Sequence, residues 1–258
     1  MTHYMNLVQS AFRKIADGSK TIELRLNDEK RQKINVNDTV VFNCTTTKGI
    51  ITAQVFGLHK FSDFKELYNA LPLENCGYTV AELHSAHYTD MEEYYTKGQI
   101  EKYGALGIEL CNVSSIFDVK EIITEPDILK LLAPSVFNPT EERLLKRAKK
   151  YGEDENINIY AYKVDCNYKG IVVFEIKDNN ATILDIAVKP EYRGRGVGSK
   201  LIDFIFNQFG VHSITAETDD DAIGFYKKYG FTVAKTETKF NTKRYIWYVI
   251  NRKDKINV

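Results

Sequence analysis

Three glycines fall within the five residues 194–198, between an apolar segment that ends at Val188 and an amphipathic segment over 198–209. The apolar segment predicts a strand and the amphipathic one predicts a helix. Glycine removes the side chains that keep a ligand off the backbone, and a helix presents unpaired N–H groups at its start. The helix dipole, Arg193 and Arg195 add positive potential. The segment therefore predicts an anion site suited to a diphosphate.

Two common phosphate-binding motifs do not fit this loop. A Walker loop needs Gly-Lys followed by Ser or Thr, whereas Ser199 and Lys200 occur in the reverse order. A dinucleotide fingerprint needs Gly-x-Gly-x-x-Gly inside a βαβ unit. Here the strands expected at 158–164, 170–177 and 181–188 follow one another as a meander.

The second part of the chain is expected to form a mixed sheet with helices. Two helices, at 127–132 and 141–151, precede the meander, and Asn138 is expected to cap the second because Pro139 and Glu141 follow it. The elements expected after the loop are a helix at 198–209, a strand at 213–217, a helix at 221–229 and strands at 231–235 and 245–250.

Two motifs in this part carry a resemblance to a known family. Arg193, Gly196 and Gly198 match Gln/Arg-x-x-Gly-x-Gly/Ala, and residues 222–231, AIGFYKKYGF, match Phe-Tyr-x-x-x-Gly-Phe. With both motifs, residues 116–251 resemble the GNAT superfamily of N-acetyltransferases. The resemblance implies acetyl-CoA as cosubstrate, no metal, and direct transfer of acetyl to an unidentified amine in a ternary complex.

The resemblance also assigns roles to residues. The glycine loop would bind the CoA diphosphate, the end of the preceding strand would pair with the pantetheine arm, and Tyr226 would protonate the departing thiolate. Asp219 falls where many members have an Asn that touches the cofactor. The expected cofactor-binding residues are Ile186, Ala187, Val188, Arg193, Gly194, Arg195, Gly196, Val197, Gly198, Ser199 and Asp219.

A general base is needed because only a neutral amine attacks a thioester. Asp185 and Glu217 lie in neighbouring predicted strands and are the two candidates. Asp185 shares its parity with Ala187, but the sequence leaves open which face of the sheet carries the cleft.

The first part of the chain has a charged strand. Alternation over 21–26 places Glu23 and Arg25 on one face, next to Lys20, and the apolar residues on the other. With the segments 37–42 and 103–110, this strand resembles the ASCH domain, a relative of the PUA RNA-binding barrel, over residues 1–112. The resemblance implies a curled barrel with helices, and a cleft at Lys20, Glu23 and Arg25 suited to a nucleotide, to RNA or to the acceptor.

Some small members of that family are amidohydrolases with a catalytic Lys, Thr and Glu. Lys20 matches the lysine, but Glu23 stands where those members have the threonine. Because the hydroxyl nucleophile is missing, hydrolysis is not expected here. His84 and His87 lie three residues apart, but no third ligand is near in sequence, so surface histidines are expected rather than a metal site.

The first part is also expected to be α+β, with a seam at residues 112–116. Its expected elements are helices at 7–15, 63–70 and 91–103 and strands at 21–26, 39–43, 50–58 and 105–110, followed by a polar turn at 112–115 and a new apolar-alternating segment from 116.

Charge and cysteine content narrow the function classes. Residues 1–112 carry 12 Lys and Arg against 14 Asp and Glu, a net charge of −2, and the remaining 23 against 21 give +2. Neither part has the basic excess of a duplex-DNA binder. The apolar runs are too short to span a membrane, no export signal is evident, and four scattered cysteines indicate a reducing, cytoplasmic setting.

Two hypotheses stay open: an N-acetyltransferase, or an RNA- or nucleotide-binding regulator that binds acetyl-CoA without catalysis.

Overall fold

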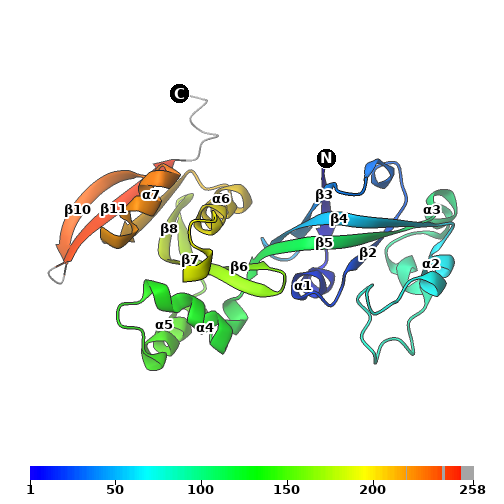
Figure 1. Cartoon of the computed structure of the whole chain (residues 1–258), viewed down its shortest axis with the longest axis horizontal. Helices are drawn as coiled ribbons and strands as arrows, with labels where there is room; N and C mark the ends of the chain where they lie inside the picture. Colours follow the sequence, from blue (N-terminus) through cyan, green and yellow to red (C-terminus); the bar gives the residue numbers. More distant parts are fainter. Residues whose placement is uncertain (219, 240–241, 251–258) are drawn as a thin grey trace. The chain divides into compact units, whose positions relative to one another are not determined.

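The computed structural model describes residues 1–218, 220–239 and 242–250 (Figure 1). These residues form helices and mixed sheet, so the expected α+β class is confirmed. The chain divides into two compact units. The first comprises Met1–Ser115 and Lys163–Asn167, and the second comprises Ile116–Tyr162 and Tyr168–Val258.

The first unit carries a mixed sheet. Strand β1 is parallel to β3, β3 is antiparallel to β4, β4 neighbours β5, and β2 is antiparallel to β5. The elements are β1 Thr2–Leu7, α1 Gln9–Asp17, β2 Ile22–Leu26, η1 Arg31–Lys33, β3 Thr39–Cys44, β4 Ile50–Phe61, α2 Phe64–Ala70, η2 Tyr88–Glu93, α3 Lys97–Tyr103 and β5 Ala105–Asp118.

Three expectations for this unit are wrong. The single helix expected at 91–103 is two separate elements, η2 Tyr88–Glu93 and α3 Lys97–Tyr103. Leu7 ends the strand β1, which pairs with β3, so the first helix begins at Gln9 rather than at Leu7. The polar turn expected at 112–115 is instead part of β5. Asn112 takes a positive φ of 50° there, so a single left-handed residue stands where a turn was expected.

The core of the first unit confirms the alternation expected for β2. Ile22, Leu24 and Leu26 are buried together with Phe64 and Leu67 of α2. The charged residues of β2 therefore face away from this core, because successive side chains of a strand point to opposite faces.

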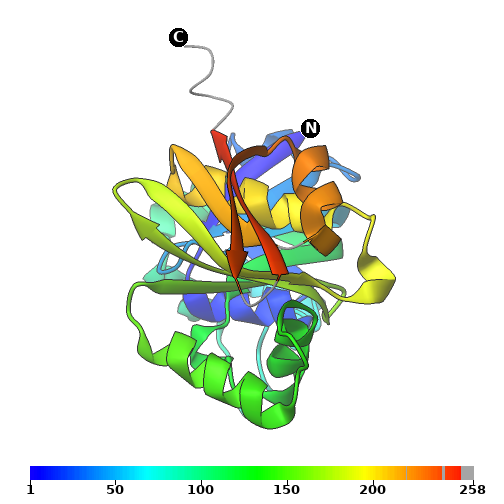
Figure 2. The same cartoon turned by 90° about the vertical axis from the view of Figure 1, so that its left-hand side faces the viewer.

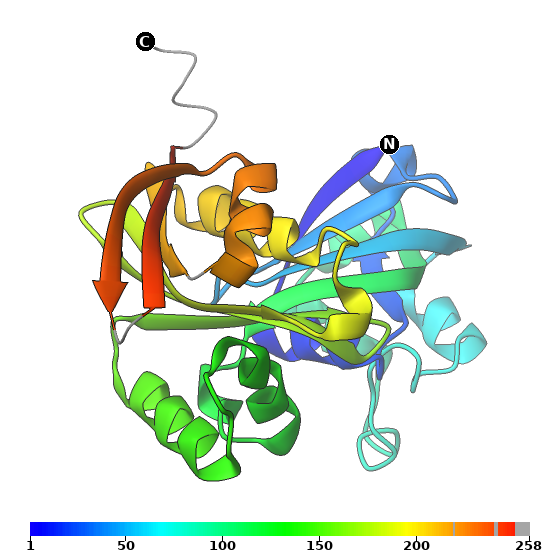
Figure 3. The ribbon, with the colours of Figure 1, turned by 60° about the vertical axis from the view of Figure 1, so that its left-hand side comes forward.

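The second unit has strands in the order β6-β7-β8-β9-β11-β10. Helices α4 and α5 cover one face of this sheet, and α6 and α7 cover the other (Figures 2 and 3). The elements are η3 Lys120–Ile122, α4 Pro126–Leu132, η4 Ala133–Ser135, α5 Glu141–Glu153, β6 Ile157–Val164, β7 Asn167–Lys177, β8 Asn180–Val188, η5 Pro190–Tyr192, α6 Val197–Phe209, β9 Ser213–Thr218, η6 Asp220–Ala222, α7 Ile223–Tyr229, β10 Thr232–Lys239 and β11 Thr242–Ile250.

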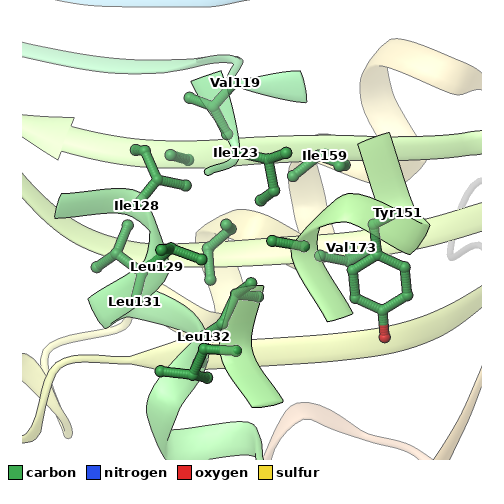
Figure 4. Close-up of a cluster of buried hydrophobic side chains, with 14 of the residues drawn as sticks. Val119, Ile123, Ile128, Leu129, Leu131, Leu132, Tyr151, Ile159 and Val173 are labelled. Atoms are coloured by element: carbon green, nitrogen blue, oxygen red, sulfur yellow. The ribbon is translucent and has the colours of Figure 1, made fainter. Parts of the chain in front are cut away.

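The two faces of this sheet bury different side chains. Ile159 and Val173 pack with the leucines of α4 in an aliphatic cluster (Figure 4). Tyr160, next along β6, points to the other face, where its ring centroid lies 4.8 Å from that of Phe204 in α6. The meander that leads into the loop is therefore buried on both faces, which holds the loop on a rigid base.

The start of α5 differs from the expectation. The N-cap is Thr140, whose hydroxyl accepts a hydrogen bond from the Arg143 N–H at 3.3 Å. Asn138 instead takes a left-handed φ of 48°, and its carbonyl accepts from the Arg143 guanidinium.

Over the described ranges, the helices are all too short or too polar to cross a lipid bilayer.

Candidate functional site

The strand before the glycine loop contains a β-bulge. Val173 of β7 pairs with Asp185 of β8, but the next residue, Phe174, pairs with Ile183. Leu184 is therefore an extra residue in β8. Such a bulge bends the strand and increases its local twist.

On its other edge β8 leaves its neighbour. Residues Asn180–Ile183 of β8 pair in parallel with residues Ser213–Ala216 of β9, and the pairing of the two strands ends there. Strand β8 nevertheless continues to Val188, and β9 continues to Thr218. Among the described residues, the backbone of 184–188 thus has no partner strand on this side. Its N–H and C=O groups need other hydrogen-bond partners, which an extended ligand can supply. This segment includes Ile186, Ala187 and Val188, which were expected to contact the pantetheine arm.

The glycine loop follows directly and opens the helix α6. Gly194 and Gly196 adopt left-handed φ values of 74° and 78°, and a Cβ at either would meet no atom within 4 Å. Gly196 is the N-cap of α6, and no side chain caps the helix. The N–H groups of the first turn, from Val197 to Ser199, are thus presented beside open space, as an anion site requires.

The third glycine of the loop has a different role. A Cβ on Gly198 would lie 2.7 Å from the ring of Phe225 in α7. Gly198 is buried, so its missing side chain lets α6 and α7 approach closely. The sequence motif therefore combines two glycines that shape the loop with one that sets helix packing.

Cations gather around one aromatic ring beside the loop. The Lys169 ammonium lies 3.8 Å from the centre of the Tyr192 ring, and the Arg195 guanidinium lies 5.6 Å from it. Arg193 donates through Nε to the carbonyl of Val188 at 3.3 Å. Lys169 is buried and Arg195 is exposed, so the positive charge extends from the sheet to the surface of the loop.

Tyr226 lies buried in α7 among other aromatic rings. Its ring contacts Phe225 and Phe231 edge-on at about 5 Å, and it stacks on Trp247 of β11 at 6.4 Å. Burial raises the pKa of the Tyr226 phenol well above its ordinary value, and the charge of Asp185 adds to this effect. The phenol therefore keeps its proton across the neutral pH range, as a proton donor must.

Asp185 is held by two residues of α5. Arg147 donates from Nε to Oδ2 at 2.7 Å and from Nη2 to Oδ1 at 2.9 Å, and the Tyr151 phenol donates to Oδ2 at 2.6 Å. The Asp185 side chain is only 2% exposed. Asp185 therefore faces α5. Three donors already occupy the carboxylate oxygens, which leaves them little access to an acceptor amine or a water.

Glu217 and Asp219 are the other two acidic residues among the expected site residues. Glu217 is exposed, while its neighbours Ala216 and Thr218 are buried. Its side chain thus points away from the packed face of the strand. Asp219, expected to contact the cofactor, lies outside the described residues.

The first unit brings its three expected residues together. Glu23 is the centre of an ion cluster: Lys20 Nζ lies 3.1 Å from its Oε2, and Arg25 Nε lies 2.8 Å from its Oε1. Arg25 also donates through Nη2 to the carbonyl of Asn6 at 2.7 Å. The Glu23 side chain is only 5% exposed, so the two cations compensate a carboxylate that has lost its water.

A pocket of about 260 Å³ opens beside this ion cluster. Lys20, Glu23 and Arg25 all line it, together with residues from four other segments of the unit. Those other lining residues are Asn6, Leu7, Val8, Ser10, Ala11, Lys14, Leu24, Cys76, Gly77, Tyr78, Glu82, Met91, Tyr94 and Tyr95. The ion cluster is therefore a wall of a cleft and not a closed internal bridge.

The two histidines singled out in the sequence, His84 and His87, are both exposed. The ring of His87 lies tilted against that of Tyr88, with the centroids 4.1 Å apart, and its Nδ1 lies 2.8 Å from the Thr89 hydroxyl. Within the described ranges, no three His, Cys, Asp or Glu side chains are grouped so as to hold a metal ion.

Arg147 and Tyr151 were missed in the sequence. They lie four residues apart on α5, which is a visible helical spacing, but their partner Asp185 lies 38 and 34 residues further along the chain. Only the packing of α5 on β8 brings the three together.

Family models match both units of the chain. The model described as the ASCH domain matches residues 5–114, and the one described as the acetyltransferase (GNAT) domain matches residues 155–233. The second match contains the bulged strand, the glycine loop and Tyr226.

Individual relatives are similar over part of the chain. An uncharacterised N-acetyltransferase, ycf52, of Pyropia yezoensis is 36% identical over 55 residues, which is 20% of this chain and 32% of that protein. The corresponding protein of Gracilaria tenuistipitata var. liui is also 36% identical. The match spans about a third of the length of these curated relatives.

Solved structures are similar over about half of the chain. Ard1 from Thermoplasma volcanium is 25% identical, with 53% of this chain and 97% of that chain covered and a TM-score of 0.43. The PaiA N-acetyltransferase from Thermoplasma acidophilum in complex with coenzyme A is 17% identical, with 54% and 99% covered and a TM-score of 0.42. The two family matches lead to one conclusion: the chain joins an ASCH domain, matched over residues 5–114, to an acetyltransferase domain of the GNAT family, matched over residues 155–233.

Proposed function

We propose that this protein is an acetyl-CoA-dependent N-acetyltransferase that transfers acetyl to an amine by direct attack in a ternary complex. The observation that carries the proposal is the edge of β8 at 184–188, which has no partner strand among the described residues and leads into a helix start at Gly196 that no described side chain caps. An extended amide-containing arm that ends in a diphosphate matches this sequence of hydrogen-bonding groups.

The residues present fit such a ligand. The backbone of Ile186 to Val188 would bind the pantetheine arm, and the N–H groups of residues 194–199 would bind the diphosphate. Asp219, at the position in the motif pattern where many members have a cofactor-contacting Asn, is also proposed to contact the cofactor. Acetyl-CoA supplies an activated acetyl thioester. The positive charges of Lys169, Arg193 and Arg195 add attraction for the phosphates.

Tyr226 is proposed as the general acid. Its protonated phenol would donate to the sulfur as the carbon–sulfur bond breaks. Of the two candidate bases, we favour Glu217, because it is exposed and therefore accessible to water and acceptor. Asp185 is then a positioning residue, which ties α5 to β8 through Arg147 and Tyr151.

The test is thiol release from acetyl-CoA, measured with a panel of amines, polyamines, aminoglycosides and nucleosides. The acetyltransferase proposal predicts that one class of amine increases thiol release, and that mass spectrometry detects the acetylated amine. The regulator hypothesis predicts a different outcome, in which acetyl-CoA raises the melting temperature but no amine increases thiol release above background hydrolysis.

For the first unit, we propose ligand binding in the pocket beside Lys20, Glu23 and Arg25. The support is the cleft itself, since buried charges that only stabilise a fold do not need an opening of 260 Å³ beside them.

A further inference from the structure

The charges that line the pocket of the first unit do not cancel. Three cations, Lys14, Lys20 and Arg25, face two carboxylates, Glu23 and Glu82. The lining therefore carries one positive charge in excess. Asp90 accepts a hydrogen bond from the Tyr78 phenol at 3.0 Å and is not one of the residues that line the pocket. Burial raises the pKa of the Cys76 thiol to about 11, so Cys76 contributes no negative charge at neutral pH.

The cations keep donors for a ligand. A lysine ammonium has three N–H groups and an arginine guanidinium has five. Lys20 Nζ and Arg25 Nε lie at ion-pair distance from Glu23, but among the described residues Arg25 Nε and Glu23 Oε2 are buried without a hydrogen-bond partner, and Arg25 donates from Nη2 to the Asn6 carbonyl. Both side chains are more than four-fifths buried, so their charge is weakly screened and already oriented by the carboxylate between them.

Part of the lining is aromatic. Tyr94 and Tyr95 form a wall in which their ring centroids lie 6.4 Å apart with the ring planes inclined at 56°, and Tyr95 stacks on Phe64 at 5.9 Å. Tyr78 and Met91 also line the pocket. An aromatic ring of this wall can offer its apolar face to a planar ligand.

The size and charge of the pocket exclude a polymer as its proper occupant. Ligand pockets commonly measure about 300–1,000 Å³, so a pocket of 260 Å³ suits one small molecule. Nucleic-acid binding relies on many phosphate contacts and a basic surface, whereas this pocket has one excess positive charge and residues 1–112 carry a net charge of −2.

We propose that the pocket of the first unit binds a small aromatic monocarboxylate as a single molecule. Its carboxylate would lie against Lys20 and Arg25, and its ring would lie against the wall of Tyr94 and Tyr95. The proposal rests on the ligand-binding role given above to this unit, but it does not depend on acetyl transfer by the second unit.

The experiment is isothermal titration calorimetry on the full chain. The probes are benzoate, 4-hydroxybenzoate and phenylacetate, each compared with its neutral amide of nearly the same shape. We expect at least one acid to bind at least tenfold more tightly than its amide, because charge-assisted hydrogen bonds are worth more than neutral ones. Equal affinity for acid and amide, or no binding of any acid at millimolar concentration, overturns the proposal.

Two variants and a control locate the binding. Lys20→Gln removes one pocket cation and should weaken the bound acid about tenfold or more. Tyr94→Ala, at a residue that is 58% exposed and safe to truncate, should weaken it by a smaller factor. Lys97→Gln removes an equally positive residue that is exposed and does not line the pocket, and it should leave the affinity unchanged. Equal losses of acid affinity in Lys20→Gln and Lys97→Gln would show that the acid responds only to net charge, and would overturn binding in the pocket.

Further probes separate the competing ligands. Adenosine monophosphate, inorganic phosphate and a ten-residue uridine oligonucleotide should each bind more weakly than the best acid. If one of them binds more tightly and loses affinity in Lys20→Gln, the pocket is a nucleotide, phosphate or RNA site and the monocarboxylate proposal is wrong. Acetyl-CoA should still raise the melting temperature of Lys20→Gln, so a failure of acid binding is distinguishable from a failure of the acetyltransferase proposal.

Discussion

The glycine loop of the second unit and the pocket of the first unit are built from different groups. The loop offers backbone N–H groups to a ligand, and the glycines at 194 and 196 leave the space beside the backbone open. The pocket offers side chains, with Lys20 and Arg25 held around a buried Glu23. The glycine loop is therefore a backbone site, and the pocket of the first unit is a site made of charged side chains.

This difference determines how each site tolerates change. A backbone site is damaged by an added side chain and is little affected by the loss of an exposed one. A side-chain site is damaged by removing a single charge, because its partners are then left buried without compensation. Catalysis in the second unit should nevertheless depend on one side chain, that of Tyr226.

Tyr226→Phe should lower kcat for acetyl transfer by about 10²–10⁴-fold, the range typical of general acid catalysis. The phenol is buried and its raised pKa keeps it protonated. Because the protonated form is the active one, activity should fall through this group only as pH rises above about 10, the ordinary value for tyrosine. Steady-state kinetics between pH 6 and 10 check the loss of kcat and should show no fall in activity from this group over that range.

Tyr229→Phe is the matched control for Tyr226→Phe. Tyr229 lies on the same helix, and its phenol lies 2.6 Å from the Asp203 carboxylate at the surface. It should retain most of the turnover. Acetyl-CoA affinity should be similar in both variants, and a large loss of affinity in Tyr226→Phe would make that residue a packing aromatic.

Gly196→Glu should abolish binding of acetyl-CoA. The substitution places a side chain and a negative charge at a residue with φ of 78°, where the diphosphate is proposed to lie. The stabilisation expected for the unchanged protein, about 2.7 kcal/mol at a ligand concentration of one hundred Kd, should disappear from thermal melts.

Gly210→Glu provides the control, because Gly210 has φ of 64°, open space beside it, and a position at the opposite end of α6. The strain of the substitution is similar there, but no ligand is proposed. If the two variants lose the acetyl-CoA shift equally, the loss reflects helix strain and the loop is not the binding site.

The backbone site could be predicted from the sequence more fully than the side-chain site. The loop, its strand and its helix are contiguous, so Arg193 to Gly198 could be identified from a short motif. The role of Gly198 could not, because Phe225 belongs to another helix. In the first unit, alternation along β2 predicted the charged face of Glu23 and Arg25, but the pocket also needs α1 and the segments around Cys76 and Tyr94. Side chains that meet only through packing leave no local pattern.

Asp185→Asn should lower the free energy of unfolding by about 2 kcal/mol, since it weakens two charge-assisted bonds from Arg147 and one bond from Tyr151. Urea unfolding measures the change. Asp203→Asn, which alters a carboxylate with one tyrosine partner at the surface, should cost less than half as much. A cost for Asp185→Asn no larger than this control would remove its positioning role.

Gly198→Ala should lower the free energy of unfolding by about 1–3 kcal/mol, the usual range for overpacking. The new Cβ would lie 2.7 Å from the Phe225 ring. Combining it with Phe225→Leu should restore part of the loss, because the smaller side chain leaves room. Stabilisation by Gly198→Ala alone would show that the two helices do not touch closely at this point.

Arg195→Ala should have the smallest effect, a loss of no more than about fivefold in acetyl-CoA affinity, because exposed charges contribute about 0.2–1 kcal/mol. Arg195 is exposed and lies 5.6 Å from the Tyr192 ring, without a carboxylate partner among the described ion pairs. The loss should shrink further as salt is raised, since an exposed charge is screened. Lys20→Gln in the pocket should cost about tenfold or more in acid binding, and this loss should be less sensitive to salt because Lys20 is buried. If Arg195→Ala instead weakens acetyl-CoA as strongly as Lys20→Gln weakens the acid, the loop binds through its side chains, and the contrast between a backbone site and a charge site fails.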